Sequence, residues 1–184
     1  MNNLHLTNSL TNKKEIFNPI NKENVSLYAC GPTVYDNPHV GNARALVVFD
    51  LLFRILIELY GEKKVSYVRN ITDIDDKIIE TSKTKKIGIS DLTKSVTEKF
   101  HKDCKILFCL KPTQEPRATD HVEGMINMTK KLIEKNAAYE KEGHVFFAVK
   151  SFEKYGKLSN KNPDDLKAGA RVEVSKLKND PLDF

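Results

Sequence analysis

The segment CGPTVYDNPHVGN contains residues that could bind a nucleotide, His39, Gly41 and Asn42, and a thiol, Cys30. A histidine ring and an asparagine amide can donate hydrogen bonds to phosphoryl oxygens, and a glycine lets a phosphate or a flat base approach the backbone. The segment therefore predicts a nucleotide-handling site with a cysteine beside it. The His-x-Gly pattern alone is weak evidence, because a histidine before a helix is more often a cap or a surface residue.

Strand, turn and helix signals indicate how these residues are positioned. Residues 24–29 lead into a β-prone run, which Gly31 and Pro32 interrupt, and an apolar-rich stretch from Gly41 to Tyr60 predicts a helix. The helix is apolar on most sides, so we expect it to be buried against a sheet. Gly61 follows its last residue and fits a left-handed C-terminal cap. The first backbone N–H groups of the helix lack helical partners and, with the helix dipole, predict a phosphate site.

A second strand over residues 63–70 predicts a β-α-β unit with parallel strands. Ligands of such sheets bind outside the carboxyl ends of the strands, so we expect Cys30 and the segment NITDIDDK (70–77) to be neighbours. The Thr72 hydroxyl is expected to face the same crevice. The three acids of this segment are better explained as helix caps than as metal or acid–base groups; they are Asp73, Asp75 and Asp76.

The remaining segments predict two helices and an α+β region. Residues 90–110 predict an amphipathic helix capped by Ser90 and ended by Pro112, and residues 115–136 predict another with His121 at its start. The inward side chains expected of the first helix are Leu92, Val96, Phe100, Cys104, Leu107 and Phe108, and those of the second are Val122, Met125, Ile126, Met128, Thr129, Leu132 and Ile133. The sequence further predicts a hairpin over 137–149 around Gly143, and a short helix then a strand over 166–174.

The composition indicates the broad class of protein. The chain has 184 residues, of which 40% are hydrophobic, enough for one domain or one domain with an insertion. A net charge of +5 fits a polyanionic partner, but the lysines are spread along the chain, which favours an ordinary solvated surface. The sequence shows neither a long uncharged apolar run nor a secretory signal pattern, and its three cysteines match no disulfide scaffold. These features predict a cytosolic protein, with Cys104 and Cys109 in its core.

Two longer motifs carry a family resemblance. CGPTVYDNPHVGNAR and YVRNITDIDDKII resemble the N-terminal half of cysteinyl-tRNA synthetases, and LKPTQEPRATDHV, YGKLSN and AGARVEV continue the likeness in the same order. The resemblance covers essentially the whole chain. His39, Val40, Gly41 and Asn42 take the place of the HIGH motif of class I synthetases, with asparagine at its last position.

The resemblance implies an α/β fold: the first half of a Rossmann-like class I catalytic domain over residues 1–122, with a parallel sheet and flanking helices. An inserted α+β connective segment would begin at residues 123–184. It also implies a cytoplasmic, monomeric, membrane-free enzyme that joins cysteine to ATP, with Mg²⁺, and transfers the cysteinyl group to tRNA(Cys).

The resemblance assigns roles to individual residues. His39 and Asn42 would be catalytic and, with Gly41, would bind ATP. Cys30, Gly31 and Thr72 would bind the substrate cysteine, and Cys30 would be one ligand of a Zn²⁺ that holds the substrate thiolate. The soft sulfur of cysteine binds zinc better than the hydroxyl of serine does, so the enzyme would select cysteine over serine without an editing site.

The chain also departs from the family pattern. It has no tryptophan and no KMSKS loop, and the remaining zinc ligands are expected beyond Phe184, since His101, His121 and His144 show no ligand spacing with Cys30. We therefore expect a half-fold with an exposed sheet edge that is inactive or nearly so alone. Alternatives are a cysteine-activating ligase with an amino-sugar acceptor, a non-catalytic fragment that binds tRNA or protein, and an unrelated nucleotidyltransferase.

Overall fold

The computed structural model describes residues 4–161 and 175–184, which divide into two compact units. The unit with the residues predicted to do chemistry runs from Pro19 to Val122, and the other combines the described parts of Met1–Asn18 and Glu123–Phe184. Within the described residues, no helix combines the length and the apolar character needed to cross a membrane.

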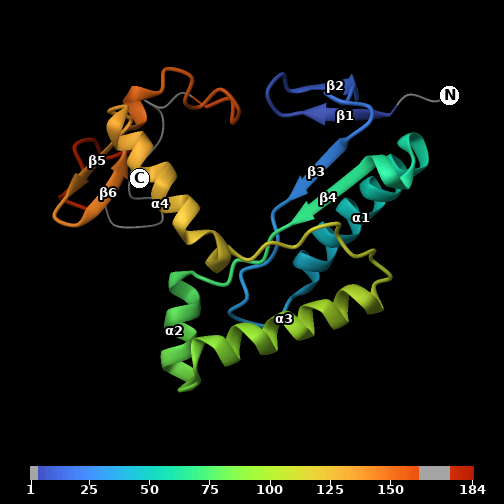
Figure 1. The fold of residues 1–184 in the computed structure, drawn as a ribbon, viewed down its shortest axis with the longest axis horizontal. Coiled ribbons are helices and arrows are strands. Elements are labelled where there is room, and N and C mark those ends of the chain that lie inside the picture. The colour runs from blue at the N-terminus through green and yellow to red at the C-terminus, as the bar shows by residue number, and fades with distance from the viewer. Residues whose placement is uncertain (1–3, 162–174) are drawn as a thin grey trace. The chain divides into compact units, whose positions relative to one another are not determined.

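The first unit is built on the predicted β-α-β arrangement. Strand β3 (Val25–Ala29) leads through a loop to helix α1 (Val40–Tyr60), and strand β4 (Val65–Arg69) follows a short 3-10 turn, Glu62–Lys64. The two strands pair in parallel, with Leu27 opposite Tyr67, and α1 runs alongside them (Figure 1). The predicted strands, helix and parallel pairing are confirmed.

An extended segment after helix α3 (Ile89–Ile106) lies along the other edge of β4. Its backbone contacts are parallel, with bridges from Val68 to Gln114 and from Ile71 to Arg117. The Gln114 N–H donates to the Tyr67 carbonyl, and the Arg69 N–H donates to the Gln114 carbonyl. The sequence pattern predicted a helix from residue 115, but residues 115–117 are used to cover this sheet edge, and helix α4 (Val122–Glu134) begins later.

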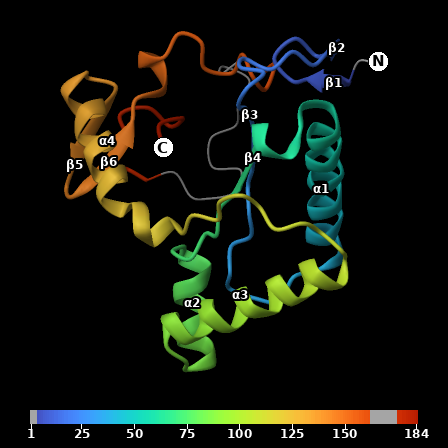
Figure 2. The same ribbon diagram turned by 45° about the vertical axis from the view of Figure 1, so that its right-hand side comes forward.

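The helices of this unit cover one face of the strand pair. Residues 65, 67 and 69 of β4 are buried on that face, where the Tyr67 and Phe53 rings have centroids 5.1 Å apart. Helix α3 passes below the carboxyl ends of the strands, next to helix α2 (Asp76–Lys85) (Figure 2). A hydrophobic core joins α1, α2, α3 and the loop after β3; its buried members are Val34, Leu46, Ile71, Ile78, Leu92, Val96, Phe100 and Cys104.

Several helix details differ from the sequence expectation. Helix α1 buries one stripe only, and its outer face leaves Val48 and Leu51 more than half exposed. Gly61 has a positive φ of 90°, but its ψ of 142° is extended rather than left-handed helical.

Helix α3 starts after Gly88 with no side-chain cap, so Ser90 is not the cap. Leu107 follows the last helical residue and Phe108 is 84% exposed, so neither is a core residue as predicted.

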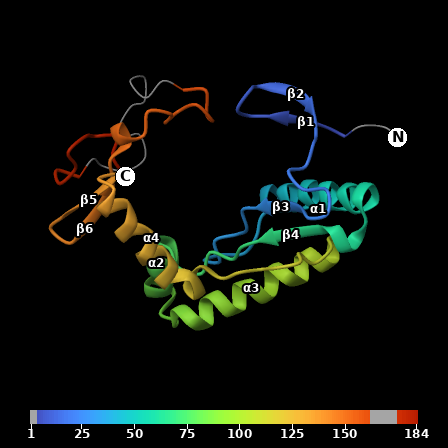
Figure 3. The same cartoon turned by 45° about the horizontal axis from the view of Figure 1, so that its top comes forward.

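The second unit holds two antiparallel hairpins and α4. Strands β1 (His5–Asn8) and β2 (Lys13–Ile16) form one, and β5 (Ala138–Lys141) and β6 (His144–Phe147) form the other, beside α4 (Figure 3). The predicted hairpin around Gly143 is confirmed, and His121 ends a 3-10 turn, Ala118–His121, directly before α4. No residue of α4 is buried, contrary to its predicted inward face. The helix and strand predicted over 166–174 lie outside the described residues.

Candidate functional site

His39 caps the start of α1. Its backbone is extended, its Nδ1 accepts a hydrogen bond of 3.1 Å from the Gly41 N–H, and its own N–H donates to the Asn42 Oδ1 at 3.0 Å. An Nδ1 atom that accepts carries no proton, so a neutral ring carries its proton on Nε2. The cap therefore leaves the Nε2–H of His39 to donate to a ligand.

Gly41 is needed for this cap. A Cβ atom at position 41 would lie 2.9 Å from Cε1 of His39, closer than real Cβ atoms approach other atoms, and 3.0 Å from Nδ1, at the tight limit of real contacts. Any side chain here would push the ring away from the Gly41 N–H. The sequence suggested that this glycine makes room for a ligand, but its first consequence in the fold is room for the imidazole.

The capping contacts change the predicted phosphate site. The N–H groups of Asn42 and Ala43 both donate to the His39 carbonyl, and that of Gly41 is bound to the ring, so these three first-turn amides already have partners. No acidic residue lies in the first turn, so nothing there offsets the positive end of the helix dipole. Among the described residues, the donors left for an anion at this end are Nε2 of His39, Nδ2 of Asn42 and the backbone N–H of Val40.

The carboxyl ends of β3 and β4 are tied together, as predicted. The Gly31 N–H donates to the Asn70 Oδ1 at 2.9 Å, and the Asn70 Nδ2 donates to the Thr72 hydroxyl at 3.0 Å. The Thr72 N–H donates to the Pro32 carbonyl, and the Thr72 carbonyl accepts from the Val34 N–H. This network fixes the loop after β3 against the loop after β4. Sequence reasoning missed Asn70, although its position directly after a strand was an available signal.

Gly31 is the tightest point of this junction. A Cβ atom here would lie 1.6 Å from the Asn70 carbonyl oxygen and 3.3 Å from Cγ of Arg69. Only a residue without a side chain allows the two backbones to approach this closely. Cys30 precedes this glycine, is exposed and is a free thiol.

Two adjoining pockets bring most of the predicted site residues together. One, of about 60 Å³, is lined by Cys30, Gly31 and Asn42, and the other, of about 270 Å³, by Gly31, His39 and Asn42. Both pockets share Gly31 and Asn42, so the cysteine side and the histidine side of the site are continuous. Thr72 lines neither pocket and is connected to them through its hydrogen bond with Asn70. Gly41 also lines neither pocket, and its contribution is to position the His39 ring.

The prediction that the acids of the second loop are helix caps is confirmed for Asp75, whereas Asp73 instead binds a distant turn. Asp75 caps α2 by accepting from the Lys77 N–H, and Asp73 is buried and accepts from both the N–H and the hydroxyl of Thr119. Burial acts to raise the pKa of Asp73, but the hydrogen bonds from Thr119 and the nearby Arg117 outweigh it, so this pKa lies below its usual value.

Arg69 is a second residue that sequence reasoning missed. It is 4% exposed, lines the pocket beside Cys30, and its guanidinium is bound to Glu115 at 2.7 Å. It also lies over the Phe100 ring, 4.9 Å from the centroid. An arginine at a strand end gives no sequence signal of burial, because its partner lies on a distant segment.

A metal ion is not held by this site alone. Among residues 4–161 and 175–184, no three His, Cys, Asp or Glu side chains are grouped as a metal would require. Zinc takes four ligands in closed sites and three protein ligands in catalytic ones, so the thiol of Cys30 can supply one ligand but cannot hold the ion by itself.

A β-α-β unit whose helix begins at His-Val-Gly-Asn is an α/β arrangement, and ligands of such sheets bind at the carboxyl ends of the strands. Residues 16–184 match the family described as tRNA synthetases class I (C) catalytic domain. The chain belongs to this family, which confirms the predicted resemblance.

The curated relatives are named cysteine–tRNA ligase. The chain is 56% identical to the protein of Pelagibacter ubique and 51% identical to that of Rickettsia prowazekii, each over 98% of the chain and 40% of the relative. The protein of Beijerinckia indica is 56% identical with the same coverage. The chain thus spans about 40% of the length of the curated relatives it matches.

Proposed function

We propose that this chain is the N-terminal part of a cysteine–tRNA ligase and forms the first half of its Rossmann-like catalytic domain. The observation that carries the proposal is 50–56% identity to proteins of that name over nearly the whole chain. The proposed domain spans residues 1–122, with a connective segment beginning at 123. The closeness of Cys30, Gly31, His39 and Asn42 around two adjoining pockets supports it.

The proposed reaction has two steps. A carboxylate oxygen of cysteine attacks the α-phosphorus of ATP and pyrophosphate leaves, giving cysteinyl-adenylate. The terminal ribose hydroxyl of tRNA(Cys) then attacks the carbonyl carbon, loses its proton, and AMP leaves. Mg²⁺ would accompany ATP in the first step.

His39 and Asn42 would stabilise the phosphates in the first step. The cap holds the His39 ring by Nδ1 and the Asn42 side chain by Oδ1, so Nε2–H and Nδ2–H are preoriented donors at the positive end of α1. Preorganised donors of this kind stabilise charge that develops in a transition state without reorganisation. Gly41 would contribute by keeping the ring in the cap and the approach to the adenine open.

Substrate cysteine would bind on the Cys30 side. Gly31 would line its pocket, and Thr72 would contribute through Asn70, which binds both residues. Cys30 would supply one thiolate ligand to a zinc ion, whose chemistry would be selective binding of the substrate sulfur. The other ligands would have to come from outside the described residues, so no step of the reaction is derived through the metal. The free thiols support a cytoplasmic enzyme, which we propose to be a monomer.

A chimera tests this proposal. The chain replaces the matching 40% of the Pelagibacter ubique cysteine–tRNA ligase, and cysteine-dependent ATP–pyrophosphate exchange and tRNA(Cys) charging are measured. We expect both activities, and a loss of about 10²–10³-fold in exchange for His39→Ala and for Asn42→Ala. Lys94→Ala, an exposed change on α3, is the matched control and should leave exchange unchanged.

The outcomes are distinct. A folded chimera that exchanges but does not charge tRNA supports an amino-sugar acceptor, and one that does neither refutes the ligase assignment. The isolated chain is expected to be inactive or nearly so. Exchange by the isolated chain at the rate of the relative would refute that part.

A further inference from the structure

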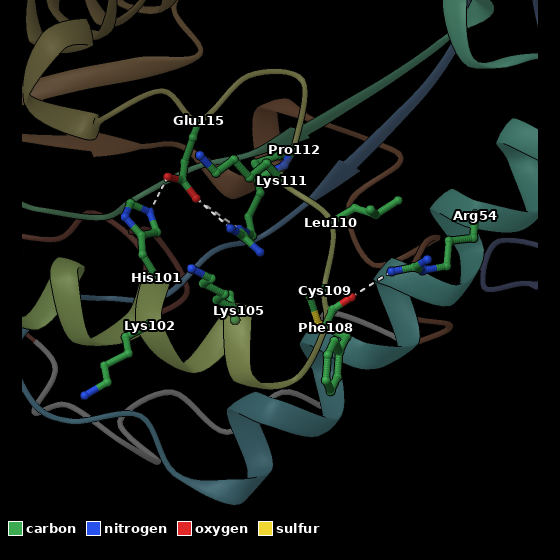
Figure 4. Close-up of a pocket in the computed structure, with 12 residues that line it drawn as sticks. Arg54, His101, Lys102, Lys105, Phe108, Cys109, Leu110, Lys111, Pro112 and Glu115 are labelled. Atoms are coloured by element: carbon green, nitrogen blue, oxygen red, sulfur yellow. Dashed lines mark hydrogen bonds and ion pairs between the residues drawn. The ribbon is translucent and has the colours of Figure 1, made fainter.

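A large basic cavity lies beside the candidate site in the first unit. It has a volume of about 1110 Å³ and is formed by the second half of α1, the end of α3 and the segment 108–115 (Figure 4). Arg69 lines both this cavity and the small pocket beside Cys30. His39 and Asn42 do not line it, and none of its chemistry is used in the proposed reaction.

The charges of the cavity are unbalanced. Its lining contains five lysines and arginines but one acid, Glu115, which is bound to Arg69 at 2.7 Å and to His101 at 2.5 Å. Arg54 is paired with Asp50, at 2.7 Å.

Three lysines in the lining remain without an ion-pair partner among the described residues: Lys102, Lys105 and Lys111. In Figure 4 the side chains of Lys105 and Lys111 extend toward the side where Glu115 and His101 lie, whereas Lys102 extends away. A concave surface with surplus positive charge attracts anions.

The thiols of the cavity do not offset this charge. Burial raises the pKa of Cys104 and that of Cys109, so both stay protonated at neutral pH.

An exposed aromatic residue lies at the rim. Phe108 is 84% exposed and has a positive φ of 56°, a left-handed conformation that costs energy for a residue with a side chain. Two contacts to α1 hold this turn: Arg54 donates to the Phe108 carbonyl at 2.7 Å, and the Leu110 N–H donates to Asp50 at 2.6 Å. The ion pair on α1 thus holds the backbone turn that leaves the Phe108 ring in solvent at the cavity, where in Figure 4 it points away from the ends of Lys105 and Lys111.

We propose that this cavity binds a nucleotide, with Lys105 and Lys111 contacting its phosphates and Phe108 stacking on its base. Lysines with an exposed aromatic ring are the combination by which proteins bind nucleotides without sequence preference. The volume exceeds that of typical small-ligand pockets, about 300–1,000 Å³, so the site accommodates either a free nucleoside triphosphate or a nucleotide of a single-stranded RNA. The cavity shares Arg69 with the pocket beside Cys30 but contains neither His39 nor Asn42, and this inference does not depend on the proposed function.

The absence of tryptophan from the sequence provides a local reporter. Phe108→Trp places the chain's single tryptophan at the cavity rim, so its fluorescence responds to ligand here and not to ATP near His39. The 184-residue variant is titrated with ATP, with a uridine tetranucleotide and with inorganic tripolyphosphate. We expect saturable quenching by ATP or by the tetranucleotide, and weaker binding of tripolyphosphate, because it cannot stack.

Variants in the same background test the lysines. Lys105→Ala with Lys111→Ala should raise the Kd for the better nucleotide probe about tenfold, while Lys94→Ala, also on α3, should leave it unchanged. Circular dichroism and thermal unfolding check that each variant folds, which is expected because all three lysines are exposed.

Each outcome bears on the proposal. Tighter binding of ATP identifies a free nucleotide as the ligand, and tighter binding of the tetranucleotide identifies single-stranded RNA. Absence of saturable quenching, an unchanged Kd in the double lysine variant, or equal affinity for tripolyphosphate would overturn the nucleotide site. None of these results affects the exchange assay of the chimera, so the two proposals can fail independently.

Discussion

Replacing Gly31 by alanine should open the junction between the two strand ends. The new Cβ would lie 1.6 Å from the Asn70 carbonyl oxygen, and real Cβ atoms keep at least 3.0 Å, so the backbones must separate by about 1.4 Å. Both partners at this contact are backbone, so no side-chain rotation can relieve it. The shift would break the 2.9 Å hydrogen bond from the Gly31 N–H to Asn70.

The hydrogen bonds across this junction set the size of the destabilisation. The bonds of Thr72 to Pro32 and Val34 depend on the same approach of the loops. Breaking two or three hydrogen bonds at about 0.5–1.5 kcal/mol each, with about 1–3 kcal/mol of packing strain, lowers the free energy of unfolding by about 2–7.5 kcal/mol. That is a large share of the stability of a domain of this size.

Urea unfolding followed by circular dichroism measures this destabilisation, and amide hydrogen exchange at Val34 and Thr72 shows whether it is local. Gly124→Ala is the control, because its Cβ meets nothing within 4 Å and α4 should gain up to about 1 kcal/mol. An unfolding free energy of Gly31→Ala within about 0.5 kcal/mol of the parent, with both amides still protected, would refute the steric argument.

Three further changes test other parts of the first unit. Asp73→Asn should cost about 1–3 kcal/mol at pH 7. The folded-state pKa of Asp73 is lowered, so its carboxylate contributes to the free energy of unfolding above the unfolded pKa of about 3.9, and this contribution disappears as pH falls through the folded pKa. Urea unfolding at pH 7 and pH 2.5 should therefore show the unfolding free energies of the parent and of Asp73→Asn converging in acid. Gly41→Ala should displace the His39 ring, which the imidazole NMR signals would report. It should also lower ATP–pyrophosphate exchange by the chimera about tenfold. Unchanged imidazole signals would contradict the close contact of 2.9 Å. Asp50→Ala should destabilise the chain by about 1–3 kcal/mol and increase proteolysis after Phe108, since it removes the acceptor of the Leu110 N–H; equal cleavage rates would count against it.

The β-α-β unit was predictable because its signals are local. Apolar runs, the break at Gly31 and Pro32, and the helix start after His39 act within a few residues of one another. The same local rules failed where distant segments compete for a residue. Residues 115–117 have a helical pattern but continue the edge pairing from β4 to Ile71 just after it, because the unpaired N–H and C=O groups of that edge gain more from a partner than from one further helical turn.

The candidate site, too, was predictable only in part. The sequence by itself determined which chemical groups are present and that Cys30, His39 and the loop after β4 meet at the strand ends. Only the structure decided that the cap occupies the amides of Gly41, Asn42 and Ala43, so that Nε2 of His39, Nδ2 of Asn42 and the Val40 N–H remain as donors.

The two residues that sequence reasoning missed depend on long-range contacts. Asn70 joins Gly31 to Thr72, and buried Arg69 has its carboxylate partner in Glu115, after α3. The basic cavity likewise draws its charges from α1, α3 and the segment after it. Local pattern fixes secondary structure through short-range sterics and hydrogen bonds, but burial and the pairing of charges depend on which distant segments the fold brings together.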